Sequence, residues 1–176
     1  AHMALHMGVV ALAAPPIALG LSGGRFDPTR RAPGVFHPIA ASIFELAAVW
    51  GWHAPALHHA ARHATGALVL EQMTFLVAGL WLWLAAVGAG RGARMARAWR
   101  GVAGLLFTPN HMTLLGAVFV LTPRALYSAT TPDTLWEQHL GGGIMLLAGG
   151  VSYLAGGLSV AMQGLTRAQR NRVGTA

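Results

Sequence analysis

The sequence predicts an all-α fold, a polytopic membrane helix bundle with about five transmembrane helices, and three observations carry this prediction. Hydrophobic residues make up 55% of the 176 residues, and the mean hydropathy is +0.53. Charged residues make up only 10%, whereas a soluble domain usually carries about a quarter. Long apolar stretches recur along the chain and alternate with short polar ones. This pattern is typical of an integral membrane protein.

Each predicted span is an apolar stretch close to the roughly 20 residues that a helix needs to cross a bilayer core of about 30 Å. In chain order the stretches are residues 3–22, 35–52, 66–90, 101–123 and 141–163. The connections are residues 23–34, 53–65, 91–100 and 124–140, which hold the Gly, Pro and charged residues expected of turns. We therefore expect residues 1–176 to form a single transmembrane helical domain.

The last stretch, 141–163, is rich in small residues spaced four apart, among them Ser152 with Gly156 and Gly157 with Ala161. Such spacing lets two helix backbones approach closely. The small-residue face could pack inside the bundle or against a second copy of the chain. A homo-oligomer formed through this span is therefore left open.

The distribution of arginine predicts the orientation in the membrane. Three arginines lie in residues 23–34, four in 91–100 and three after residue 163, whereas the other two connections contain one each. With five spans, the three arginine-rich segments fall on one side of the bilayer. Because basic residues accumulate on the cytoplasmic side, we expect the N-terminus outside and the C-terminus in the cytoplasm. The localisation predicted is the bacterial inner (cytoplasmic) membrane.

The composition also excludes several classes of function. The chain has no cysteine, which excludes disulfides, iron–sulfur ligation and thiol nucleophiles. Five acidic residues leave little for a paired-carboxylate hydrolase, and we expect no enzymatic activity. In so apolar a chain, the formal charge of +7 indicates orientation in a lipid bilayer, and we expect no nucleic-acid binding.

Histidines gather at one predicted membrane boundary. Of nine histidines, those that fall at the outer boundary are His2, His6, His53, His58, His59, His63 and His139. The strongest pattern is His2-Met3-Ala4-Leu5-His6-Met7, because in a helix the two histidines stack on one face and the two methionines on the next. Imidazole with thioether is a ligand set that suits Cu(I) and, to a lesser degree, haem iron.

Three further residues are candidates for the same outer site. His53 follows a tryptophan at the end of the second stretch, and His139 lies just before the fifth. Glu71 enters the third stretch from the same side, roughly 7 Å deep. Glu71 could bind the metal or fix the tautomer of a histidine. Equally, it could pair with Arg62 or Arg124.

Two ionisable residues fall near the middle of the membrane. Glu45 and His111 each lie ten residues from the cytoplasmic start of their stretches, roughly 15 Å deep. Ionisable groups at this depth are costly and usually paired, so we expect Glu45 and His111 to hydrogen-bond directly or through water. We favour a structural pair; the alternative is a second, deep metal site that Met112 would complete.

Several motifs resemble one known family. They are His2-Met3-x-x-His6-Met7 followed by Ala14-Pro15-Pro16, Trp52-His53-x-Pro55, Leu70-Glu71-x-x-x-Phe75-Leu76-x-x-Gly79, Pro123-x-x-Leu126-Tyr127, and Gln138-x-Leu140-x-Gly142. Because these motifs occur in this order along nearly the whole chain, the sequence resembles the CtaG-type membrane proteins, which are assembly factors for caa3-type cytochrome c oxidase. It departs from the family at Gln72, where members commonly have histidine, and in its smaller number of spans.

The resemblance implies a role in maturing haem–copper oxidase, and the ligand chemistry favours delivery of Cu(I) from the periplasmic side. The partners expected are the lipid bilayer, haem–copper oxidase subunits and periplasmic copper chaperones. Two alternatives stay open. One is a metal-free scaffold for oxidase assembly. The other is a b-type haem redox subunit, although His2 and His6 share a helix and axial haem ligands must come from opposite sides of the porphyrin.

Overall fold

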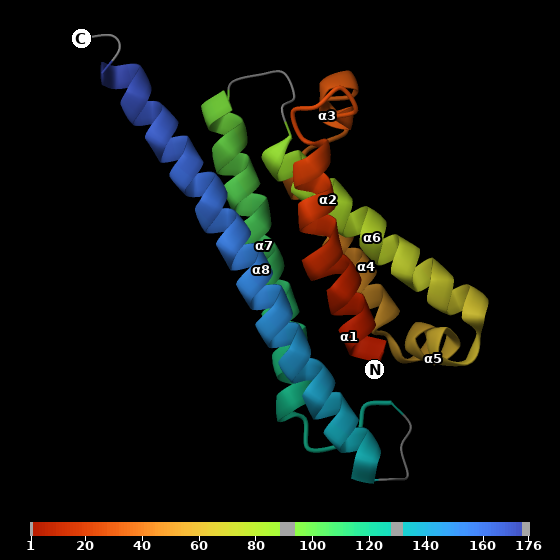
Figure 1. Ribbon diagram of the computed structural model, residues 1–176. Helices are drawn as coiled ribbons and strands as arrows, with labels where there is room; N and C mark the ends of the chain where they lie inside the picture. The colour runs from red at the N-terminus through yellow and green to blue at the C-terminus, as the bar shows by residue number, and fades with distance from the viewer. Residues whose placement is uncertain (1, 89–93, 128–131, 174–176) are drawn as a thin grey trace.

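The computed structural model describes residues 2–88, 94–127 and 132–173, and throughout these segments every regular element is a helix (Figure 1). The elements are α1 (His2–Met7), the π-helix η1 (Gly8–Ala13), α2 (Ala14–Leu21), α3 (Pro28–Arg31), α4 (Pro38–Trp52), α5 (Pro55–His63), α6 (Thr65–Val87), α7 (Arg94–Leu121) and α8 (Pro132–Val173). The all-α prediction is confirmed.

Four helical segments of the described chain are long and apolar enough to cross a membrane: His2–Leu21, Thr65–Val87, Trp99–Leu121 and Leu135–Thr166. They correspond to four of the predicted spans. Residues 89 and 90, the predicted end of the third span, lie outside the described residues, as does the start of the connection at 91–93.

The remaining predicted span, 35–52, is the shorter apolar helix α4. Pro38 occupies its first turn, where proline is tolerated because the missing N–H has no intrahelical partner. With 15 residues, α4 is about 22 Å long, less than the bilayer core of about 30 Å. It nevertheless returns the chain from the end where α3 lies to the end where α5 lies (Figure 1).

The first three elements form one continuous rod, and its irregular middle follows from two prolines. Pro15 and Pro16 have no backbone N–H and cannot donate to the carbonyls of the preceding turn. The backbone widens to a π-helix just before them. The carbonyl of Ala11, which Pro15 would otherwise serve in an α-helix, accepts a hydrogen bond from Ser152 Oγ of α8 at 2.6 Å.

After α2 the chain turns through Gly23, whose φ of 76° lies in the left-handed region that favours glycine. Asp27 then caps α3. One carboxylate oxygen accepts from the Gly23 N–H at 2.8 Å and the other from the Thr29 N–H at 2.9 Å. This buried carboxylate fixes the arginine-rich connection at one end of the bundle.

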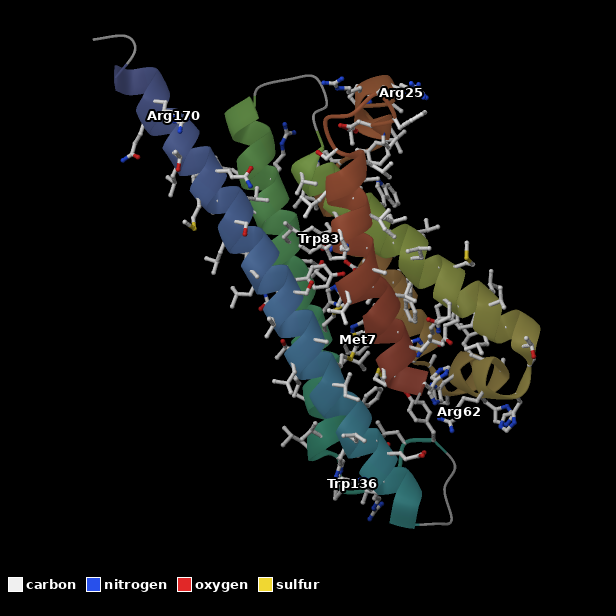
Figure 2. The ribbon with its side chains drawn as sticks, viewed as in Figure 1. Met7, Arg25, Arg62, Trp83, Trp136 and Arg170 are labelled. Carbon is white, nitrogen blue, oxygen red and sulfur yellow. The ribbon has the colours of Figure 1, made fainter. Side chains whose placement is uncertain are left out.

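The two ends of the bundle carry different residues (Figure 2). Arg25 and Arg170 lie at the end that holds α3 and the C-terminal part of α8. Arg62 and Trp136 lie at the opposite end, with α5 and the N-terminus. The arginine-rich connection 23–34 and the C-terminal tail are therefore on the same side, as the sequence predicted.

The small residues of α8 are used within the bundle. A Cβ at Gly156 would lie 2.2 Å from the ring of Trp83 on α6, and one at Gly142 would lie 2.7 Å from the Gly116 carbonyl of α7. At these two positions α8 approaches a ring and a backbone carbonyl so closely that only glycine fits. A homo-oligomer through this span stays a prediction.

Candidate metal centre

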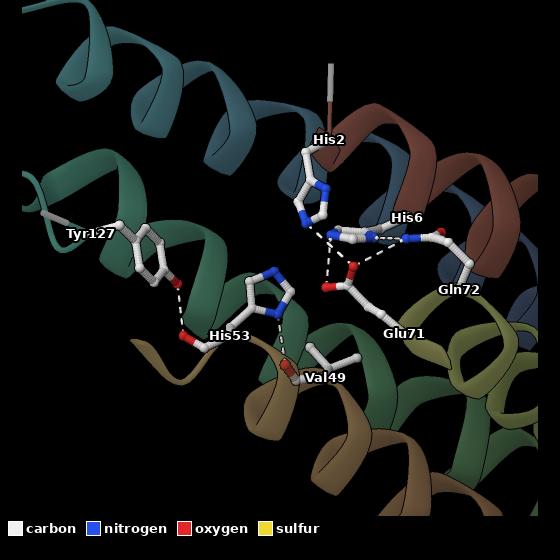
Figure 3. A network of polar contacts seen from close by, with 7 residues as sticks. All are labelled: His2, His6, Val49, His53, Glu71, Gln72 and Tyr127. Atoms are coloured by element: carbon white, nitrogen blue, oxygen red, sulfur yellow. Dashed lines mark hydrogen bonds and ion pairs between the residues drawn. The ribbon is translucent and has the colours of Figure 1, made fainter. Parts of the chain in front are cut away.

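Two histidines of the first rod and one glutamate of α6 meet at the end of the bundle that holds the N-terminus (Figure 3). His2 Nε2 lies 3.3 Å from one oxygen of Glu71, and His6 Nε2 lies 3.5 Å from the other. His6 and Glu71 are 1% and 0% exposed. One ligand atom from each of the three residues lies within 4.8 Å of the other two.

The spacing in this cluster fits metal ligation better than hydrogen bonding. Within the described chain, His2 Nε2, His6 Nε2 and Glu71 Oε1 have no hydrogen-bond partner although all three atoms are buried. Such buried, unpaired polar atoms are costly. Two ligand atoms on one tetrahedral metal ion, at about 2.1 Å each, are about 3.4 Å apart, which matches the distances to Glu71.

His53, predicted for the outer site, lies beside the cluster. Its ring centroid is 5.7 Å from that of His6. Its Nδ1 lies 2.6 Å from the Val49 carbonyl, so Nδ1 carries the proton and Nε2 keeps its lone pair. Tyr127 Oη donates to the His53 carbonyl at 2.7 Å, which fixes the end of α4. Burial lowers the pKa of His53 and keeps the ring neutral.

His58 is one of the histidines that the sequence places at the outer boundary, and the structure brings it to the edge of the cluster. It lies on α5, with its ring centroid 5.4 Å from that of His2 and stacked on Tyr127 at 3.8 Å. Burial, followed by the nearby His2, His53 and Arg62, lowers the pKa of His58 to about 4. A neutral imidazole is the form that binds metals. The signal available in the sequence was its position in a short helical segment directly after His53.

Gln72 contacts two members of the cluster. Its Nε2 lies 2.8 Å from His6 Nδ1 and 3.3 Å from Glu71 Oε2, and both are within donor reach. Gln72 Oε1 is buried without a hydrogen-bond partner among the described residues. A half-turn of the amide would bring this oxygen to His6 Nδ1. The His6 proton would then sit on Nδ1, leaving Nε2 free to bind a metal.

The methionines and His139 take other positions. Met3 lies against α8 at Gly141, and Met7 is buried in the hydrophobic core. No finding tests either sulfur as a ligand, so this stays a prediction. His139 Nε2 lies 3.2 Å from the Thr122 carbonyl, and none of its described contacts reaches the cluster. That His139 joins the outer site stays a prediction.

Glu45 and His111 do not form the direct hydrogen bond that we expected as one possibility, and a bridge through water stays a prediction. Glu45 is fully buried, but it accepts hydrogen bonds from Tyr153 of α8 and from Thr108 of α7, the latter at 3.1 Å. Neither ring nitrogen of His111 has a hydrogen-bond partner in the described chain. The sequence predicts that Glu45 and His111 lie at a similar depth, but the face of α7 that points toward Glu45 carries Thr108. Met112 is fully buried against α8, and a deep metal site with Glu45 and His111 stays a prediction.

Comparison with known protein families identifies the family of this chain. The profile of the cytochrome c oxidase caa3 assembly factors (Caa3_CtaG) matches residues 1–167. The chain belongs to this family. No curated protein and no solved structure matches it. As a Caa3_CtaG member, it is a multi-pass membrane protein of cytochrome c oxidase assembly, and the family resemblance seen in the sequence is confirmed.

Proposed function

We propose that this Caa3_CtaG protein binds copper at the cluster of His2, His6 and Glu71 and delivers it to a haem–copper oxidase. The observation that carries the proposal is the convergence of these buried ligand atoms, without hydrogen-bond partners among the described residues, at distances that suit one metal ion. A membrane protein this poor in polar residues rarely leaves imidazole and carboxylate unpaired without a function.

The donor set supports copper. Imidazole suits Cu, Zn, Fe and Ni, and among divalent ions the affinity of a nitrogen and oxygen site is greatest for Cu²⁺. His53 and His58 supply further imidazoles at the edge of the cluster. Cu(I) accepts two or three imidazoles, whereas a carboxylate ligand favours Cu(II). Glu71 would therefore matter more for the oxidised ion, and His2 with His6 for the reduced one.

The distances between rings support a single centre. Imidazole centroids around one metal ion lie about 5 Å apart, given metal–nitrogen bonds of about 2 Å. The centroid distances are 4.3 Å for His2 with His6, 5.4 Å for His2 with His58 and 5.7 Å for His6 with His53. Small movements of these four rings would bring all of them to one ion. Exchange among these imidazoles would also permit release to a partner.

The orientation proposed is the N-terminus and the cluster on the periplasmic side of the inner membrane. The separation of Arg25 and Arg170 from Arg62 across the bundle supports it. Because the chain has no cysteine, single cysteines can report it. A membrane-impermeant maleimide should label Arg62→Cys in intact cells and Arg25→Cys only after lysis. The reverse pattern would overturn the orientation.

Copper binding is tested by titration of the detergent-purified chain, with Cu(I) under anaerobic conditions and with Cu(II) in air. The parent should bind tightly, His2→Ala/His6→Ala should lose this binding, and His139→Ala is the matched control because His139 lies outside the cluster. Equal binding in parent and double variant would overturn the site. No copper binding by the parent would leave the metal-free scaffold, and a haem absorbance band would favour the b-type haem subunit.

A further inference from the structure

Helix α5 presents histidines on two opposite faces. It comprises nine residues, Pro55–His63, beside the N-terminus. His58 is 7% exposed and faces the buried cluster, where its ring lies near that of His2. His59 and His63 are exposed on the other side. One short helix therefore links the surface to the proposed copper centre.

The two exposed histidines have the geometry of a chelate. His59 and His63 are four residues apart, so they lie on one face of the helix. Their ring centroids are 4.2 Å apart. Neither ring makes a hydrogen bond or an ion pair with any residue that the structure describes. Both rings are thus free to bind a metal ion from solvent, and no structural role accounts for their pairing.

We propose that His59 and His63 form an external capture site for divalent copper, and that α5 passes the ion inward through His58. Two imidazoles and solvent oxygens are ligands that Cu²⁺ accepts in a tetragonal arrangement. Arg62, exposed between the two histidines in the sequence, adds a positive charge nearby and keeps the site weak enough to exchange. Capture stands independently of the buried centre, whereas the inward transfer rests on the proposed function.

The capture site is tested with Cu²⁺ alone, added to the detergent-purified full chain and followed by electron paramagnetic resonance. The parent should show a weaker copper species beside the tight one. His59→Ala/His63→Ala should lower the copper affinity of the weaker species by at least about tenfold. Loss of an outer-shell partner alone lowers metal affinity by about 10–100-fold, and this variant removes two direct ligands. Because both side chains are exposed, the variant should keep its melting temperature.

A second variant moves one histidine along α5, and it tests whether copper binding depends on the spacing of the pair or only on the number of histidines. His59→Ala/Leu57→His keeps nine histidines but places the pair six residues apart, on different faces of α5. It should behave like the double alanine variant. A weaker species unchanged in both variants would overturn the capture site.

The inward transfer is tested by stopped-flow loading of the tight site. Loading should slow in His59→Ala/His63→Ala while the final tight occupancy stays the same. An unchanged loading rate would overturn transfer along α5. His2→Ala/His6→Ala distinguishes this inference from the proposed function. If this variant loses tight binding but keeps the weaker species, both sites are supported. If its tight site is unaffected, the buried centre is contradicted and the capture site is not.

Discussion

Gln72 gives the sharpest test of how the buried centre is organised. Its amide nitrogen lies 2.8 Å from His6 Nδ1, an arrangement in which Nδ1 accepts and Nε2 carries the proton. Metal binding through Nε2 needs the opposite tautomer, with Nδ1–H donating to an acceptor. Gln72 can supply that acceptor by rotating its amide, at the loss of its 3.3 Å contact with Glu71.

Two substitutions at this position should act in opposite directions. Gln72→Ala removes the acceptor, and loss of such an outer-shell partner lowers metal affinity by about 10–100-fold, or about 1.4–2.7 kcal/mol. Gln72→Glu supplies an ionised acceptor, whose hydrogen bond is roughly twice as strong as a neutral one. It also places a second negative charge next to Glu71, which the metal would neutralise. We therefore expect tighter metal binding in the glutamate variant.

The assay is a competition titration of the purified chain with Cu(I) and with Cu(II), beside Gln163→Ala as the control. Gln163 is exposed on α8 and should not affect binding. The order expected is Gln72→Glu tighter than parent, and Gln72→Ala weaker. Equal affinities for parent and Gln72→Ala, or a shift of both variants in the same direction, would refute the assigned role of the amide.

Three further substitutions test other parts of the structure by thermal unfolding in detergent. Tyr153→Phe removes a hydrogen bond to the buried carboxylate of α4 and should destabilise the fold by about 1–3 kcal/mol; an unchanged melting temperature would contradict that network. Gly156→Leu would meet the ring of Trp83 and should cost at least about 1–3 kcal/mol, whereas Gly150→Leu, with no atom within 4 Å of a Cβ, should be tolerated. Because burial lowers the pKa of His58 from 6.5 to about 4, the folded chain binds fewer protons than the unfolded chain between these values. Its contribution to stability is complete above pH 6.5 and is lost as the pH falls toward 4; His58→Ala should flatten this dependence, and an equal slope in both proteins would count against a buried neutral ring.

The sequence was most informative where one helix carries the whole pattern. His2 and His6 are four residues apart, so helical geometry alone predicts that they share a face, and their rings lie 4.3 Å apart. The apolar stretches likewise predicted the long helices to within a few residues, with two exceptions. Helix α7 begins seven residues before residue 101, and the polar ends of α8 continue the helix well beyond residues 141–163.

Contacts between helices were harder to predict, because depth in the membrane does not determine rotation about a helix axis. Glu45 and His111 were placed at one level, but the side chain that turns toward Glu45 is Thr108, one turn earlier on α7. The burial of His58 beside His2 was not predicted for the same reason. Its burial depends on how α5 folds back against α1, which no local pattern in residues 53–65 encodes.

The π-helix connects these two levels of the bundle. Because Pro15 cannot donate to the Ala11 carbonyl, that oxygen is free to accept from Ser152 of α8. One residue further along α8, the Tyr153 hydroxyl lies 3.4 Å from the Val10 carbonyl and donates to Glu45. The rod that carries His2 and His6 is thereby fixed to α8 and α4 at the level of Glu45. The positions of the proposed ligands His2 and His6 thus depend on polar contacts about one to three helical turns away, and the buried Glu45 carboxylate belongs to the same network.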